Sequence, residues 1–257
     1  GGKNNTSKMP LNKKVSPDTV KVPLDYPNHA LYKKLVAQHY DAIRMDDDLI
    51  GDILKALKTY ELDKNTLVIY FSDHGANNFV RHKQMLSEGG LHVTLIISGP
   101  EKYIPKKTTR DDLVNLIDLS ATTLGWAGIK IPSWFEGEDL FAKNFKKIRY
   151  IGGHKDRMDH TIDRVRTIRT DEFRYIKNYK LDRILLQPQY RDKKDYTKLL
   201  YKLYEEEALS DTHRDIYFGE RKDEELYNVK VDPFMLNDLS CDPNFNKILK
   251  QHRKLLD

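Results

Sequence analysis

The sequence of 257 residues contains a single cysteine, no long apolar run and no internal repeat. Because Cys241 is alone, the chain can form neither an intrachain disulfide nor a CxxC metal site. No apolar run approaches the roughly 18 residues that a membrane-spanning helix needs, and no signal peptide is recognised. The chain begins Gly-Gly-Lys-Asn-Asn without a methionine, so residue 1 need not be the native start.

The residues that are present are typical of a soluble globular protein. Hydrophobic residues make up 39% of the chain and charged residues 32%, and 15 tyrosines argue against disorder. The net charge of +5 would suit an anionic partner such as a sulfated glycan or a nucleic acid. A mixed, solvated surface explains the same charge, and we expect no nucleic-acid partner.

The first half of the chain alternates helical and strand patterns. Apolar residues recur at helical spacing over 29–60. Short, β-rich apolar runs predict strands at 67–71 and 93–97, the first of them buried on both faces. With a further helix predicted over 111–126, this order of elements is typical of an α/β fold.

After residue 145, apolar residues alternate with polar or basic ones, which is typical of half-exposed antiparallel strands. The predicted strands are 149–152, 164–169 and 173–178, with a turn at 170–172. A charged helix over 192–209, a strand at 225–229 and a closing helix over 243–256 follow. We therefore predict two units, 1–145 with an extended lead-in at 1–28, and 146–257.

The most chemically suggestive segment follows the predicted strand 67–71, which ends in Ser72-Asp73-His74-Gly75. Ligands of α/β sheets gather beyond the carboxyl ends of strands. The carboxylate of Asp73 is a hard donor suited to Ca²⁺ or Mg²⁺, whereas His74 is a more usual ligand of zinc. From the residues alone, Asp73 could equally cap a turn, and His74 could be structural.

Several motifs occur in a specific order along residues 29–257. They are Asp47 to Gly51 (D-D-x-x-G), Ser72-Asp73-His74-Gly75, Glu88-Gly89-Gly90, Gly99-Pro100, Asp118 with Thr122, Glu136 to Leu140, and Leu226-Tyr227-Asn228 through Asn237-Asp238-Leu239. This series resembles the sulfatases of the alkaline phosphatase superfamily, and most of all the heparan N-sulfatase-like branch and related polysaccharide sulfatases.

The resemblance implies a fold and a set of roles. The fold would be the C-terminal part of a large mixed-sheet α/β domain, followed by a small α+β domain with an antiparallel sheet. Asp73 would be a Ca²⁺ ligand, and His74 would occupy the next ligand position, where the family usually has Asn. Lys83, counted back from Glu88-Gly89-Gly90, would contact the sulfate, with Arg81 and His82 as neighbouring competitors.

The resemblance also places a substrate-lining loop after the first C-terminal strand. His154, Arg157 and His160 lie in this region, and a basic segment that contains histidine suits a sulfated sugar. An ordinary charged loop would have the same composition.

The nucleophile of this family is absent from the sequence. It is a formylglycine made from Cys or Ser in a C/S-x-P/A-S/x-R motif, and Cys241-Asp-Pro-Asn-Phe245 has Phe in place of the Arg. We therefore expect the C-terminal portion of a larger sulfatase, inactive alone, whose partners are an N-terminal part and a sulfated carbohydrate. The family implies a periplasmic or extracellular location.

Two other functions remain open from the sequence. One is a zinc-dependent phosphodiesterase or phosphatase of the same superfamily, and the other is a non-catalytic glycan-binding remnant.

Overall fold

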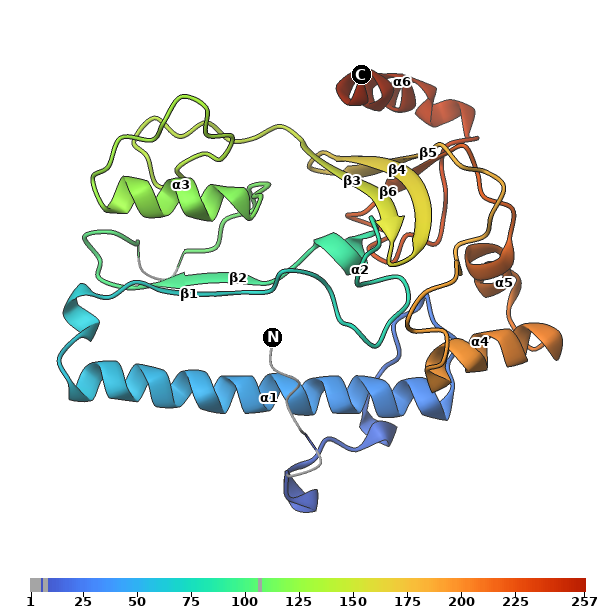
Figure 1. Cartoon of the computed structure of the whole chain (residues 1–257), viewed down its shortest axis with the longest axis horizontal. Coiled ribbons are helices and arrows are strands. Elements are labelled where there is room, and N and C mark those ends of the chain that lie inside the picture. The colour runs from blue at the N-terminus through green and yellow to red at the C-terminus, as the bar shows by residue number, and fades with distance from the viewer. Residues whose placement is uncertain (1–5, 7–8, 106–107) are drawn as a thin grey trace.

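The computed structural model describes residue 6 and residues 9–105 and 108–257 (Figure 1). Residues 1–5, 7 and 8 of the predicted lead-in lie outside the described part. The α-helices are α1 (Ala30–Thr59), α2 (Glu88–Leu91), α3 (Ile117–Trp126), α4 (Asp195–Glu205), α5 (Asp211–Phe218) and α6 (Asn246–Leu256). The strands are β1 (Val68–Phe71), β2 (Leu95–Ser98), β3 (Ile151–Met158), β4 (Thr161–Arg169), β5 (Phe173–Asn178) and β6 (Glu224–Asn228).

The long helix α1 confirms the prediction for residues 29–60. His29 caps its first turn by accepting a hydrogen bond from the Leu31 amide at 3.1 Å. The N-terminal half of α1 is in the main hydrophobic core, where Tyr32 and Val36 pack with Phe79 and with apolar residues of the 184–218 segment. This core joins the first half of the chain to the region of α4 and α5, and the boundary at residue 145 stays a prediction.

Strands β1 and β2 form an antiparallel pair in which Phe71 lies opposite Leu95 and Val68 opposite Ser98. The prediction that residues 67–71 are buried on both faces is wrong for this structure, because no residue of β1 or β2 is fully buried. The reason is that the sheet contains only these two strands within the described residues. In Figure 1 the pair is drawn between α1 and α3.

Helix α3 begins at Ile117, six residues later than the start predicted at 111. The carboxylate of Asp118, in the first turn, accepts hydrogen bonds from the Asn115 amide at 2.8 Å and the Glu138 amide at 2.9 Å. These bonds fix the chain ahead of Ile117 in a turn, so that the apolar residues there do not continue the helix.

The second sheet is a four-stranded antiparallel meander in the order β3-β4-β5-β6, and it confirms the antiparallel strands predicted after residue 145. The half-exposure predicted for residues 173–178 is wrong, because every residue of β5 except Lys177 is buried. The predicted turn joins β4 to β5, where the Thr170 amide donates to the Phe173 carbonyl at 2.9 Å. On one face of the sheet, Phe173 and Leu226 pack against Leu249 of α6. The prediction that His154 and Arg157 follow the first strand is wrong, because Gly152 and Gly153 pair with β4 and extend β3 to Met158.

Helix α4 lies within the range 192–209 and confirms the helix predicted there, whereas α5 begins at Asp211 and was not predicted. Helix α4 ends at Glu205, and Glu207 then takes a left-handed conformation with φ of 53°. Ser210 caps α5 by accepting a hydrogen bond from the His213 amide at 3.2 Å. None of the helices in the described ranges is long and apolar enough to cross a membrane.

Candidate active site

The segment between β1 and β2 is held by close backbone packing. The Gly75 amide donates to the Gly90 carbonyl at 3.0 Å. A Cβ atom on Gly75 would lie 1.7 Å from the Gly89 carbonyl oxygen, and one on Gly90 would lie 2.2 Å from the Met85 carbonyl oxygen. Only glycine allows this approach, which places the end of β1 directly against the start of α2.

Asp73 and His74 lie between the end of β1 and Gly75, next to this backbone contact. The Nδ1 atom of His74 lies 2.7 Å from the Gly75 carbonyl oxygen, so Nδ1 carries the proton and donates it. In the neutral imidazole Nε2 then carries the lone pair, and Nε2 lies 3.7 Å from Oδ1 of Asp73. The Asp73 side chain is 79% exposed, so an ion could reach both donors.

Asp73 and His74 could supply two ligands of a cation site, but not the complete set. Calcium takes six to eight oxygen ligands, and within the described ranges no cluster of three or more His, Cys, Asp or Glu side chains could hold a metal ion. The remaining ligands of such a site would have to come from other polypeptide or from water.

Lys83 is the cation of this segment whose charge is not balanced by a described carboxylate. It is half-buried, its Nζ lies 6.0 Å from the centre of the Tyr190 ring, and it forms no ion pair with any described carboxylate. Its neighbour Gln84 has φ of 67°, a strained conformation that often marks functional loops. An ammonium without a carboxylate partner is suited to binding an anion.

Arg81, by contrast, is part of the framework. It is buried, and its guanidinium lies 3.3 Å from the Asp25 carboxylate and donates to the carbonyls of Phe234 at 2.8 Å and Met235 at 3.2 Å. Because these donors are used within the protein, the structure does not support the substrate contact predicted for Arg81.

His82 also has a structural environment. Its ring stacks on Phe79 with centroids 5.0 Å apart. Burial, together with the neighbouring charge of Arg81, lowers the pKa of His82 to about 4, so its ring is neutral at pH 7. Lys83 therefore remains the cation of this triplet that an anion can reach.

The turn between β3 and β4 contacts the segment next to Lys83. Gln84 donates to one oxygen of Asp159 at 3.1 Å, and the Tyr190 amide donates to the other at 3.0 Å. His160 follows Asp159, and its carbonyl accepts from Arg157 at 3.5 Å. The predicted substrate-binding side chains of Arg157 and His160 are exposed, and the turn that carries His160 contacts the residue next to Lys83 through the bond between Gln84 and Asp159.

His154 is separated from this group. It lies on the exposed side of β3, opposite Arg166 of β4. His154 lies five positions before Asp159, which corresponds to about 16 Å along an extended strand. None of its contacts within the described residues joins it to the Lys83 segment.

Arg191 is a residue that the sequence did not reveal. It is fully buried and donates to the carbonyls of Phe79 at 3.3 Å and Lys83 at 3.1 Å, while Gln189 accepts from its Nε at 2.7 Å. Arg191 therefore fixes the backbone of the basic segment. Residues 187–192 have no periodic pattern, and nothing in the sequence distinguishes this arginine from the other exposed-looking cations.

Glu88 anchors the other end of the segment. Its Oε1 lies 3.0 Å from Nε of Arg169 and 2.6 Å from Nη2 of Arg174. Burial alone would raise the pKa of Glu88, but the charges of Arg174 and Arg169 outweigh this effect and hold the pKa below its usual value. The Nδ1 atom of His92 lies 3.5 Å from the same carboxylate.

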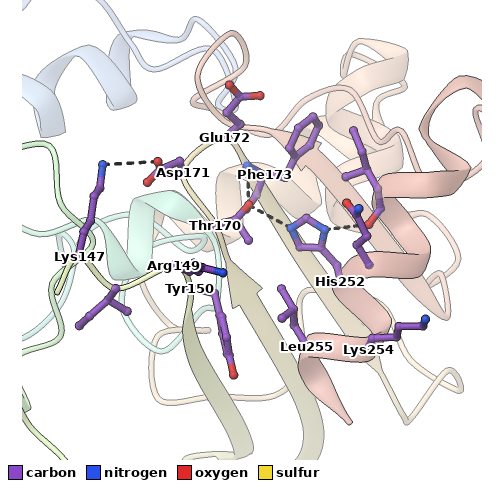
Figure 2. A pocket seen from close by; sticks show the side chains of 13 residues that line it. Lys147, Arg149, Tyr150, Thr170, Asp171, Glu172, Phe173, His252, Lys254 and Leu255 are labelled. Carbon is purple, nitrogen blue, oxygen red and sulfur yellow. Dashed lines mark hydrogen bonds and ion pairs between the residues drawn. The ribbon is translucent and has the colours of Figure 1, made fainter.

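A separate cavity of about 990 Å³ lies between α6, the β4–β5 turn and the segment that leads into β3 (Figure 2). His252 forms part of its wall, with its ring held by Thr170 at 3.1 Å and by the Ile248 carbonyl at 2.9 Å. Lys147 and Asp171 form an ion pair at its rim, at 3.5 Å. The lining includes none of Asp73, His74 and Lys83, so this cavity is not the candidate site.

Two family models match the chain. The model described as "Sulfatase" matches residues 2–129, and the model described as "N-sulphoglucosamine sulphohydrolase, C-terminal" matches residues 75–216. The second match alone covers more than half of the chain.

Individual relatives agree with these matches. An ulvan-active sulfatase of Formosa agariphila is 29% identical over 238 residues, covering 92% of this chain and 40% of the relative. A Delta 4,5-hexuronate-2-O-sulfatase of Bacteroides thetaiotaomicron is 27% identical, covering 90% of this chain and 42% of the relative. The chain thus spans about two fifths of the length of these relatives.

The fold is also shared with sulfatases of known structure. The solved structure of a 2-O GAG sulfatase matches with a TM-score of 0.65 at 23% identity, covering 94% of this chain and 49% of that protein. The chain therefore belongs to the sulfatase family and has the fold of the C-terminal part of its alkaline phosphatase-like structure.

Proposed function

We propose that this chain is the C-terminal portion of a calcium-dependent formylglycine sulfatase that removes sulfate from a sulfated carbohydrate. The observation that carries the proposal is the Lys83 ammonium, which has no carboxylate partner among the described residues. Lys83 lies on the segment that follows Asp73 and His74, and Arg191 holds its backbone carbonyl. Membership of the sulfatase family supports sulfate hydrolysis as the reaction class. The local geometry supports the binding of an anion next to a cation site.

Each site residue has a role in this proposal. Lys83 binds a sulfate oxygen and stabilises the charge that develops on the leaving oxygen. Asp73 would hold Ca²⁺ through its carboxylate, with His74 at the next ligand position, and the ion when bound would supply positive charge beside the sulfate. Arg157 and His160 bind the sugar from the β3–β4 turn.

The reaction adds water to a sulfate ester or N-sulfate and yields an alcohol or amine and inorganic sulfate. The nucleophile would come from the part of the relatives that this chain does not match. Cys241 is exposed, and Asp242 caps the turn before α6 by accepting from the Asn244 amide at 2.9 Å, which supports an ordinary helix start there. The chain alone is therefore expected to be inactive and to need an N-terminal part as its partner.

The substrate class follows from the relatives. One is described as acting on ulvan and another on a 2-O-sulfated hexuronate. We accordingly propose a sulfated polysaccharide or its oligosaccharides as the substrate, and a periplasmic or extracellular location, where such polymers are found.

The test is sulfate release by the complete enzyme, formed by this chain together with a sulfatase N-terminal part. Ulvan and glycosaminoglycan oligosaccharides are incubated with the enzyme, and inorganic sulfate is measured by ion chromatography. We expect release that EGTA abolishes, that Ca²⁺ restores, and that a Lys83→Met variant lacks. Hydrolysis of a phosphodiester with zinc and no sulfate release would overturn the proposal.

A further inference from the structure

Tyr190 is an aromatic residue at the candidate site that has no role in the proposed reaction. It lies in the connection between β5 and α4, and its ring centre is 6.0 Å from Nζ of Lys83. That distance exceeds the roughly 4 Å of van der Waals contact, so the ammonium leaves room for a ligand beside the ring. Tyr190 is 47% exposed, but a single exposed aromatic residue is ordinary and indicates no function by itself.

The side chain of Tyr190 is, however, held at both ends. The Tyr190 amide donates to the Asp159 carboxylate at 3.0 Å, and the hydroxyl donates to Oδ1 of Asn77 at 2.9 Å. The backbone of Asn77 is fixed in turn, because its carbonyl accepts from Tyr196 at 3.4 Å and from Arg191 at 3.5 Å. The position of the ring is therefore set before any ligand binds.

These bonds place the ring at the meeting point of three parts of the candidate site. Asn77 lies three positions after His74, in the loop that follows β1, and Asp159 lies in the β3–β4 turn. The Asp159 carboxylate also accepts from Gln84, the residue after Lys83, at 3.1 Å. The loop after β1, the basic segment and the β3–β4 turn are thus each connected to the ring.

An exposed aromatic face that is fixed beside a cation suits a pyranose ring that carries a sulfate. The π-face of an aromatic ring is negative, so it attracts the weakly positive C–H groups of one sugar face and leaves the sugar hydroxyls free for polar contacts. Tyrosine makes such a contact at low entropic cost, since it has only two side-chain torsions, and the bond to Asn77 already restrains them in Tyr190. Aromatic walls with a few placed polar groups are usual in small-molecule sites.

We infer that Tyr190 is the stacking platform for the sugar ring whose sulfate Lys83 binds. The inference rests on the proposed function, and it adds the contact by which the site distinguishes a sulfated sugar from inorganic sulfate. The aromatic ring makes this contact, and the hydroxyl only orients the ring. A tyrosine with a purely structural role would instead act through its bond to Asn77.

The test measures binding to the complete enzyme, formed by this chain together with a sulfatase N-terminal part. The nucleophile of that part is replaced by alanine, so that no sugar is hydrolysed during calorimetric titration. The probes are inorganic sulfate and a panel of sulfated ulvan and glycosaminoglycan disaccharides. Tyr190→Leu should weaken binding of the sulfated sugars at least about tenfold and leave the affinity for inorganic sulfate unchanged.

Three results would overturn the inference. One is an unchanged affinity of Tyr190→Leu for the sugars, and another is an equal loss for the sugars and for inorganic sulfate. The third is a wild type that binds no sugar of the panel more tightly than it binds inorganic sulfate.

Two further variants separate the ring from its surroundings. Tyr190→Phe keeps the ring and loses the bond to Asn77, so its affinity for the sugars should stay within about threefold of the wild type. If Tyr190→Phe loses as much affinity as Tyr190→Leu, the ring is not a platform. Tyr40→Leu is the matched control, because Tyr40 is 46% exposed on α1 and should affect neither kind of probe.

Kinetics of the enzyme with an intact nucleophile separate the platform from the reaction. Because stacking holds the sugar equally in the ground state and the transition state, Tyr190→Leu should raise KM and leave kcat nearly unchanged. If the sugars bind through Tyr190 but no sulfate is released, the platform stands and the proposed function fails. If sulfate is released with the same KM by Tyr190→Leu and the wild type, the proposed function stands and the platform fails.

Discussion

The ion pairs of Glu88 make a quantitative prediction about stability. In a Glu88→Gln variant the side chain keeps its shape but loses its charge. The guanidinium of Arg174, whose side chain is 3% exposed and lies 2.6 Å from the Glu88 carboxylate, then becomes a buried cation without a counter-charge. Arg169 is less affected, because its side chain is 14% exposed.

The cost of such a change can be estimated from the burial of the pair. Removing one partner of a buried ion pair typically costs 3–5 kcal/mol, and the partial exposure of Arg169 favours the low end, about 3 kcal/mol. For a chain of this size that corresponds to a fall in Tm of about 6–12 °C. Glu206→Gln is the matched control, since Glu206 and Lys202 form an exposed pair at 3.8 Å that contributes about 0.5 kcal/mol or less.

The pH dependence follows from the same pair. The pKa of Glu88 is held below its usual 4.5, so its stabilisation is fully present above that pH and is lost as the pH falls through the lowered value. Thermal unfolding followed by circular dichroism should therefore show a constant difference between wild type and Glu88→Gln from pH 5 to 8, which shrinks at lower pH. A Tm change no larger than that of Glu206→Gln would refute this reasoning.

Three further predictions concern the site. In the complete enzyme, Lys83→Met should lower kcat/KM for a sulfated oligosaccharide by about a hundredfold or more with an unchanged Tm; a smaller effect in steady-state kinetics would remove Lys83 from catalysis. Asp73→Asn should weaken Ca²⁺ binding in calorimetry at least about tenfold without altering the stability of the metal-free protein. Because burial lowers the pKa of His82 from 6.5 to about 4, urea unfolding should show up to about 3 kcal/mol of stability lost between pH 6.5 and 4, and His82→Phe should flatten this profile.

The sequence predicted most of the fold because its patterns are local. The helical spacing in α1 and the alternation in β4 follow from which side chains are buried, and α1, β4 and β5 are all found close to where they were predicted. β5, however, is buried at every position except Lys177, so it is not the half-exposed strand that was predicted. The predicted burial of β1 failed for a different reason. A strand that is apolar on both faces is typical of a sheet that is covered on both sides, and the described residues do not cover β1 in this way.

Less of the candidate site could be predicted from the sequence. Asp73, His74 and Lys83 could be selected because Ser72-Asp73-His74-Gly75 and Glu88-Gly89-Gly90 resemble motifs of the sulfatases, which imply roles for these three residues. Arg81 was selected for its charge, yet in the structure its guanidinium forms an ion pair with Asp25. The distinction depends on residues more than fifty positions away in the sequence, which no local pattern reports.

The central claim is that this chain forms one part of a sulfatase whose nucleophile lies in another part. Mass spectrometry of the native assembly under denaturing conditions, with peptide mapping, tests it most directly. The account predicts additional sulfatase polypeptide, joined to this chain or accompanying it, with a C/S-x-P-S-R peptide converted to formylglycine. An assembly that is folded and contains only residues 1–257 would contradict the account and favour a non-catalytic glycan-binding protein.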